Sequence, residues 1–277
     1  MKEQIKPIIQ KAATPLQAKN LLREYLQARI LEFIQERGLF HTWIFQGGTA
    51  LRFLYGLPRY SQVLDFSLVR PDPSYDLNQA IARIRPWFEA EAYEVDLIIK
   101  SEKNVKSAFV RFPSLLFELG LSPHQSQVFS VKIELDSQPP AGGKTDTTLI
   151  RRPVLLNIHH YDQATLLSGK LHALLARNYT KGRDIYDLFW YLSDQSWPEP
   201  NFDYLNEALK QTGWSGPQLD QNNWTDLVAE KLQAVEWRQV IEDVRPFLER
   251  ASDLNLLTKD NVLKLLAART RAARQSG

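Results

Sequence analysis

The sequence predicts an α/β protein of the α+β kind, with a mixed sheet in its first part and an all-helical C-terminal domain. Strand-like segments, with alternating polarity or with many β-branched and aromatic residues, lie before residue 160. Helical periodicity dominates from Asp162 onward. The 277 residues suffice for one large domain or two modest ones. We expect an α/β domain with an N-terminal helix over residues 1–160 and a helical domain over residues 161–277.

The elements of the first part follow from periodicity and from the residues that interrupt it. Apolar residues at helical spacing predict helices over residues 15–37, 49–55 and 76–90, with Asp76 as the N-cap of the last. Alternating or β-branched segments predict strands over residues 63–69, 93–100, 106–112, 127–135 and 154–158, while residues 139–148 are expected to be a loop.

Composition excludes several classes of function. The chain has no cysteine, so it forms no disulfide, thiolate metal site or cysteine nucleophile. A net charge of +2 does not by itself indicate nucleic-acid binding. No apolar run reaches the roughly 18 residues that span a bilayer, and residues 1–20 lack the apolar core of a signal peptide. We therefore expect a cytoplasmic protein without a membrane partner.

The segment GGTALRFLYGLPRYSQVLDFSL, residues 47–68, combines a glycine turn with an acidic strand. Gly47 and Gly48 permit a tight turn and close backbone approach to a ligand. A helix that begins at Thr49 would present unpaired N–H groups, which suit a triphosphate. Taken alone, the same pattern also fits a plain strand-to-helix turn.

The strand after this turn carries Asp65, but its partner two residues earlier is Val63. Residues i and i+2 lie on one face, roughly 6.5–7 Å apart, and two acids there could hold Mg²⁺. A later strand places Lys132, Glu134 and Asp136 on one face, which predicts either a third acidic ligand or a half-exposed polar face.

The helical part contributes paired charges. Lys170 and Arg177 are seven residues apart and share a helix face, as a phosphate-binding pair or as two solvated cations. Asp184 and Asp187 are one turn apart, where like charges repel slightly and Arg183 could offset them. Either acid could instead stabilise a helix N-terminus. The adjacent His159 and His160 have no metal-site spacing and suggest a polar domain junction.

Two of these segments resemble one family. Residues 47–66 are similar to the signature GGTAL-R-x-x-Y followed by R-[FY]-S-x-D-L-D-F of the AbiEii/AbiGii-type toxin nucleotidyltransferases, except that Val63 replaces the first aspartate. SGKLHALLARNYTKGRDIYDLFWYL, residues 168–192, resembles the family's second motif. The resemblance covers roughly residues 40–195 and implies a polymerase β-like nucleotidyltransferase core.

The resemblance implies a role for each matching position. Asp65 and Glu134 are the expected metal ligands, with Val63 at the position of the missing ligand, and Asp65, Glu134 and Asp184 are the expected catalytic residues. The expected cofactor is Mg²⁺ or Mn²⁺ and the substrate is an NTP, with the helical domain completing the active-site cleft. The expected nucleotide-binding residues are Gly47, Gly48, Thr49, Arg52, Lys170, Arg177 and Lys181.

The function that the resemblance implies is transfer of a nucleoside monophosphate from an NTP to a hydroxyl acceptor such as a tRNA 3′ end. An antitoxin would be encoded nearby, with or without direct contact. Val63 should impair transfer, whether it is natural, selected or engineered, unless Asp65 and Glu134 suffice. The alternatives are an inactive nucleotide- or RNA-binding module and an enzyme that modifies a protein or a small molecule.

Overall fold

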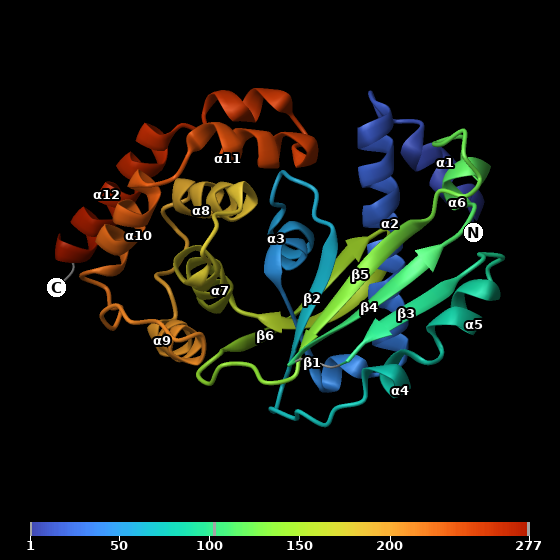
Figure 1. Ribbon diagram of the computed structural model, residues 1–277, viewed down its shortest axis with the longest axis horizontal. Coiled ribbons are helices and arrows are strands. Elements are labelled where there is room, and N and C mark those ends of the chain that lie inside the picture. Colours follow the sequence, from blue (N-terminus) through green and yellow to red (C-terminus); the bar gives the residue numbers. More distant parts are fainter. Residues whose placement is uncertain (1, 102–103, 276–277) are drawn as a thin grey trace. The chain divides into compact units, whose positions relative to one another are not determined.

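A computed structural model describes residues 2–101 and 104–275 and confirms the mixed fold class (Figure 1). The chain forms two compact units. Unit 1 contains the chain up to Gly56, together with Tyr60–Pro139 and Asp146–His160. Unit 2 contains the chain from Tyr161 onward and two short segments of the first half, Leu57–Arg59 and Pro140–Thr145.

Unit 1 is built on a seven-stranded mixed sheet with the order β3-β4-β5-β2-β1-β7-β6. β2 pairs in parallel with β5 and antiparallel with β1, so the acidic strand lies near the centre of the sheet. The strands are β1 (Trp43–Gln46), β2 (Val63–Leu68), β3 (Asp96–Lys100), β4 (Val105–Phe112), β5 (Phe129–Asp136), β6 (Thr145–Arg152) and β7 (Val154–Tyr161).

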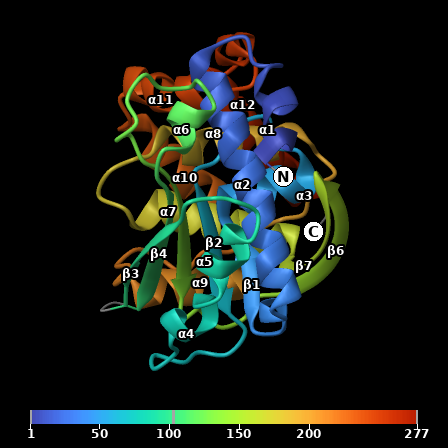
Figure 2. The same ribbon diagram turned by 90° about the vertical axis from the view of Figure 1, so that its right-hand side faces the viewer.

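The helices of unit 1 are α1 (Lys2–Ile9), α2 (Pro15–Glu36), α3 (Gly47–Tyr55), α4 (Leu77–Ile81), α5 (Ile84–Glu89) and α6 (Leu115–Glu118), with a 3-10 turn at Leu39–His41. Thr14 caps α2, because its hydroxyl accepts the N–H of Gln17 at 3.1 Å. α2 packs on β5 and α5, and Figure 2 shows both helices on one side of the strands. The long α2 therefore covers one face of the sheet.

The two faces of the central strands differ in burial. In β2, Leu64 and Phe66 are fully or almost fully buried, whereas Val63 and Asp65 are only partly buried. β5 alternates in the same way along its whole length. Strand side chains point alternately to opposite faces, so the apolar set faces the core and the polar set forms a second face.

Three expectations about elements were wrong. The expected helix over 76–90 is broken into α4 and α5, because Pro86 lacks an N–H and in a continuous helix its ring would clash with the carbonyl of Ala82. The expected loop over 139–148 contains the start of β6, a largely exposed strand at the sheet edge that lacks an apolar face. The helix expected from Thr49 begins at Gly47, and α1 was not anticipated.

Unit 2 is helical, as expected for the second part of the chain. Its α-helices are α7 (Gln163–Ala176), α8 (Gly182–Ser193), α9 (Phe202–Gln211), α10 (Trp224–Gln233), α11 (Trp237–Val244) and α12 (Lys259–Gln275), with 3-10 turns at Arg245–Phe247 and Ala251–Asn255. α7 packs against α8 and α9, and α8 packs against α11. The segment Leu57–Arg59 joins this unit through a backbone bridge between Arg59 and Leu248.

Within the described part of the chain, no helix combines the length and the apolarity that crossing a membrane requires.

Candidate functional site: an acidic strand pair and a buried charge cluster

The first group of candidate residues lies in unit 1 and is called the strand site: Gly47, Thr49, Val63, Asp65 and Glu134. Asp65 of β2 and Glu134 of β5 are direct register partners on neighbouring parallel strands. Val63, one pleat away, is the register partner of Lys132. The sheet thus brings Asp65 and Glu134 to the same row, and Lys132 binds Glu134 in an ion pair.

Gly47 brings the start of α3 against Asp65. Its φ is +77°, in the left-handed region that side chains rarely adopt, and a Cβ at this position would lie 2.5 Å from Oδ2 of Asp65. Gln46, just before it, is the register partner of Asp65 in the antiparallel pair β1–β2. The N-terminus of α3 therefore begins beside the carboxylate of Asp65.

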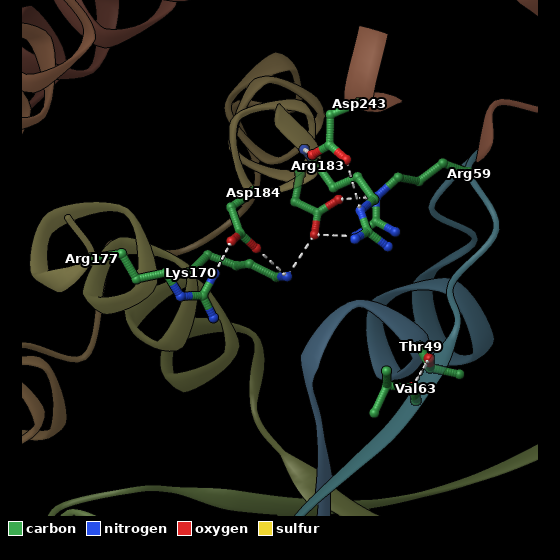
Figure 3. Close-up of polar contacts among 9 residues, drawn as sticks. Thr49, Arg59, Val63, Lys170, Arg177, Arg183, Asp184 and Asp243 are labelled. Atoms are coloured by element: carbon green, nitrogen blue, oxygen red, sulfur yellow. Dashed lines mark hydrogen bonds and ion pairs between the residues drawn. The ribbon is translucent and has the colours of Figure 1, made fainter. Parts of the chain in front are cut away.

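Thr49 is fully buried in the first turn of α3 and its hydroxyl donates to the backbone carbonyl of Val63 (Figure 3). This hydrogen bond fixes α3 to the start of β2. The hydroxyl proton is thus used within the fold, and a ligand at Thr49 would meet the backbone N–H and the hydroxyl lone pairs. The predicted contact between Thr49 and phosphate remains a prediction.

Arg52 lies further along α3 and is buried in unit 1. Its Nε donates to Glu24 of α2, and its guanidinium lies 4.3 Å from the ring centroid of Tyr60. These contacts tie α3 to α2. They give Arg52 a structural role, and its expected contact with nucleotide remains a prediction.

The residues present fit one divalent ion that is shared with substrate phosphates. Asp65 and Glu134 offer two carboxylates in register, and Mg²⁺ often takes one or two carboxylates plus phosphate oxygens. Val63 offers no ligand atom on that face. Among the described residues there is no group of three or more His, Asp or Glu side chains placed to hold a metal.

The second group lies in unit 2 and is called the charge cluster: Arg59, Lys170, Arg177, Asp184 and Asp187 (Figure 3). Nζ of Lys170 on α7 donates to Oδ1 of Asp184 at 3.0 Å and lies 2.7 Å from Oδ2 of Asp187. Nη1 of Arg177, at the end of α7, donates to Oδ2 of Asp184 at 2.6 Å. The two predicted cations and the two predicted acids therefore meet in one network.

Arg59 completes the cluster and was not among the residues predicted from the sequence. Its Nε and Nη2 donate to Oδ1 and Oδ2 of Asp187 at 2.6 and 2.5 Å, with both residues buried. Its place in the quoted R-[FY]-S motif was the available signal. Arg183, expected to offset the two acids, instead pairs with Asp243 at 3.7 Å and lies over the ring of Phe247.

The cluster keeps its groups charged in spite of burial. Burial by itself raises the pKa of Asp184, but Lys170 and Arg177 outweigh it and leave this pKa below its ordinary value. Burial likewise lowers the pKa of Lys170, but Asp187 and Asp184 reverse the shift and raise it. Three cations face two carboxylates, so the cluster has one excess positive charge that suits a phosphate anion.

Lys181 and the two adjacent histidines lie outside both groups. Lys181 is the N-cap residue of α8 and makes no ion pair among the described residues, so its predicted contact with nucleotide remains open. The ring of His159 bonds to the carbonyl of Phe40 at 3.0 Å, and that of His160 to the hydroxyl of Thr148 at 2.8 Å. Both histidines serve the packing of unit 1.

Comparisons with known proteins agree with the fold. Among solved structures, the nucleotidyltransferase toxin MenT4 from Mycobacterium tuberculosis matches with a TM-score of 0.60 at 15% identity, covering 98% of this chain and 89% of that chain. JHP933 from Helicobacter pylori matches with a TM-score of 0.53 at 15% identity, covering 91% and 94%. At such identities these matches show the fold alone.

No curated protein sequence matches the chain significantly. The family model described as nucleotidyl transferase AbiEii toxin, type IV TA (toxin–antitoxin) system, matches residues 29–263. This match spans most of the chain and includes every residue of the strand site and of the charge cluster. The chain therefore belongs to the AbiEii family of nucleotidyltransferase toxins.

Proposed function

We propose that this toxin transfers a nucleoside monophosphate from an NTP to the 3′-terminal hydroxyl of a tRNA in the cytoplasm, and that Val63 reduces its activity. The observation that carries the proposal is the register pairing of Asp65 with Glu134 beside the N-terminus of α3. Two carboxylates then lie beside a helix N-terminus, and helix N-termini commonly bind phosphate. In the family signature that residues 47–66 resemble, the position of Val63 carries the first acidic ligand.

Different residues have different roles in the proposed phosphoryl transfer. The N–H groups at the start of α3 would bind triphosphate oxygens. Lys170 and Arg177 of the charge cluster are cations that suit a phosphate anion. Asp65 and Glu134 would hold a divalent ion, which when bound supplies charge neutralisation and lowers the pKa of the attacking hydroxyl. Glu134 serves either as a ligand of that ion or as the base that accepts the proton of that hydroxyl.

Val63 leaves the strand site one ligand short. Phosphoryl transfer depends almost entirely on positioning and on electrostatic stabilisation of the transferring group. Removal of one stabilising group commonly costs about 100- to 1,000-fold in rate, and we expect a deficit of that order here. The chain would then retain nucleotide binding with slow transfer.

The test compares the protein with its Val63→Asp and Val63→Asn forms. Each is expressed inducibly to measure growth arrest, and each purified form is incubated with total RNA and four labelled NTPs. We expect strong labelling of tRNA and growth arrest only for Val63→Asp, since the asparagine has similar volume but no charge. Absence of transfer from all three forms, with intact folding, would refute the proposal.

Two other functions have support. Val63 favours an inactive nucleotide- or RNA-binding module, which would bind labelled NTP without transferring label in either form. Transfer to a protein or a small molecule fits the same strand site. Incubation of Val63→Asp with tRNA and cell protein together separates these cases, because the label then appears in one fraction only. An antitoxin, which the family description implies, would relieve growth arrest on co-expression.

A further inference from the structure

A row of partly exposed side chains crosses the polar face of the unit 1 sheet next to the strand site. The register pairs Val63 of β2 with Lys132 of β5, Lys132 with Phe109 of β4, and Phe109 with Ile98 of β3. We call these four residues the Phe109 row. Partners in register point to the same face, so the row is continuous across four neighbouring strands.

The centre of the row is an aromatic ring between two ammonium groups. Nζ of Lys132 lies 5.5 Å and Nζ of Lys100 lies 6.0 Å from the centroid of the Phe109 ring. Ile98, beside the ring, is 41% exposed. The ring is therefore flanked by cations and by exposed apolar surface on the same face as Asp65 and Glu134.

Packing of the fold does not account for this row. The neighbours of Phe109 along β4, Ala108 and Val110, point the other way and are fully buried. A polar residue at position 109 would satisfy the alternation of a half-exposed strand equally well. Lys100 makes no ion pair among the described residues, and its ammonium lies 6.0 Å from the centroid of the Phe109 ring, the outer limit of a cation–π contact.

The position of the row indicates which reactant it would meet. The helix end that suits the triphosphate lies on the β1–β2 side of Asp65, because the N-terminal glycine of α3 abuts that carboxylate. Phe109 lies on β4, beyond Glu134 on β5. It is two strand spacings from Val63, or about 10 Å. This is the side of the acids opposite to the triphosphate, where the hydroxyl acceptor belongs.

A partly exposed aromatic ring with adjacent lysines is a common means of holding single-stranded nucleic acid. Bases stack on the ring, and the cations meet the phosphates between them. We propose that Phe109 stacks against a base at the 3′ end of a single-stranded RNA acceptor, with Lys100 contacting a backbone phosphate. This assignment rests on the proposed transferase function and names the residue that positions its acceptor.

The test measures binding separately from chemistry. Fluorescence anisotropy gives the affinity of a labelled single-stranded hexaribonucleotide with a free 3′-hydroxyl, and calorimetry gives the affinity for NTPs. The variants are Phe109→Ala, Phe109→Tyr and Lys100→Ala. The control is Phe117→Ala on α6, a phenylalanine that is 48% exposed. Circular dichroism verifies that each variant is folded.

We expect Phe109→Ala to weaken oligonucleotide binding about 10-fold or more, as stacking on an aromatic side chain predicts. Phe109→Tyr should retain binding, and Phe117→Ala should not change it. Lys100→Ala should reduce the slope of log affinity against log salt by about 0.7, the value for one phosphate of a single strand. An oligonucleotide with an abasic 3′ nucleotide should bind the parent protein and Phe109→Ala equally.

Unchanged oligonucleotide affinity in a folded Phe109→Ala variant would overturn the assignment. A variant that loses affinity for NTPs but keeps its affinity for the oligonucleotide would overturn it as well. Failure of the transferase proposal gives a different pattern. If Val63→Asp transfers nothing but the Phe109-dependent binding is observed, the RNA platform stands and the chemistry assigned to Asp65 and Glu134 does not.

Discussion

Arg59 and Asp187 form a two-pronged ion pair inside unit 2, with nitrogen–oxygen distances of 2.6 and 2.5 Å and both side chains almost fully buried. The pair joins the short segment Leu57–Arg59, between α3 and β2 in the sequence, to α8. Oδ2 of Asp187 also lies 2.7 Å from Lys170. One buried carboxylate therefore holds both a linker arginine and the predicted phosphate-binding lysine.

Arg59→Met should destabilise the protein by about 3–5 kcal/mol, because it leaves Asp187 buried with one of its two cations removed. Arg59→Lys should recover only part of this, since an ammonium cannot reproduce the planar two-pronged contact. Chemical denaturation followed by circular dichroism measures the free energy of unfolding. The control is Arg238→Met, whose exposed pair with Glu242 on α11 should contribute less than about 1 kcal/mol.

The double variant Arg59→Met/Asp187→Leu distinguishes the contribution of the ion pair from the cost of leaving one buried charge unpaired. Replacing both partners with apolar residues removes the unpaired charge, so stability should recover substantially relative to Arg59→Met alone. Lys170 would then keep Asp184 as its partner. A double variant as unstable as the single one would mean that Arg59 acts through packing and not through its charge.

Lys170→Met should weaken NTP binding about 10-fold or more, the usual value of a hydrogen bond to a charged group. The reason is that Lys170 contributes to the excess positive charge of the charge cluster. Calorimetric titration with NTP measures the effect, and thermal unfolding verifies that unit 2 remains folded. Lys210→Met on α9 is the control, because this exposed lysine pairs only with Glu207 among the described residues. Equal NTP affinity in both variants would exclude Lys170 from the nucleotide site.

Asp184 makes stability depend on pH in a defined direction. Burial raises its pKa, but Lys170 and Arg177 outweigh burial, so the pKa is lower in the folded chain than in the unfolded chain. Such a group stabilises above its unfolded pKa of about 3.9, and this stabilisation is lost as pH falls through the lower folded value. Asp184→Asn should therefore be less stable than the parent protein at pH 7, with a difference that shrinks below about pH 4. Urea denaturation between pH 3 and pH 7 measures this, and a constant difference would contradict it.

The periodicity of apolar residues predicted the fold class and most elements. The core of unit 1 is formed by the alternating apolar residues of β2 and β5 and by the apolar face of α2, and both patterns are visible in the sequence. Periodicity failed at β6 because an edge strand with exposed residues has no apolar alternation to detect. It failed at residues 82–83 because the helical spacing of apolar residues continues through them, whereas Pro86 breaks the helix there.

The candidate residues were predicted by type but not by partner. Asp65 and Glu134 are far apart in the sequence, and only the register of parallel strands makes them neighbours. The role of Arg59 was not predicted because its partner, Asp187, lies 128 residues away in the sequence. The hydrogen bond from the Thr49 hydroxyl to the backbone carbonyl of Val63 could not be predicted either, because a sequence does not show which backbone group a side chain contacts.

Gly47→Ala should damage the strand site more than an equivalent change elsewhere in α3. Both Gly47 and Gly56 have φ near +77°, so alanine at either position incurs the left-handed strain of about 1–2 kcal/mol. A Cβ at Gly56 meets nothing within 4 Å, whereas one at Gly47 would lie 2.5 Å from Oδ2 of Asp65. Gly56→Ala is thus a matched control, and the extra loss of unfolding free energy in Gly47→Ala reports the displacement of Asp65.

In the Val63→Asp background, Gly47→Ala should also abolish most RNA labelling while Gly56→Ala retains it. Equal labelling by the two would show that the close approach of α3 to Asp65 has no part in transfer.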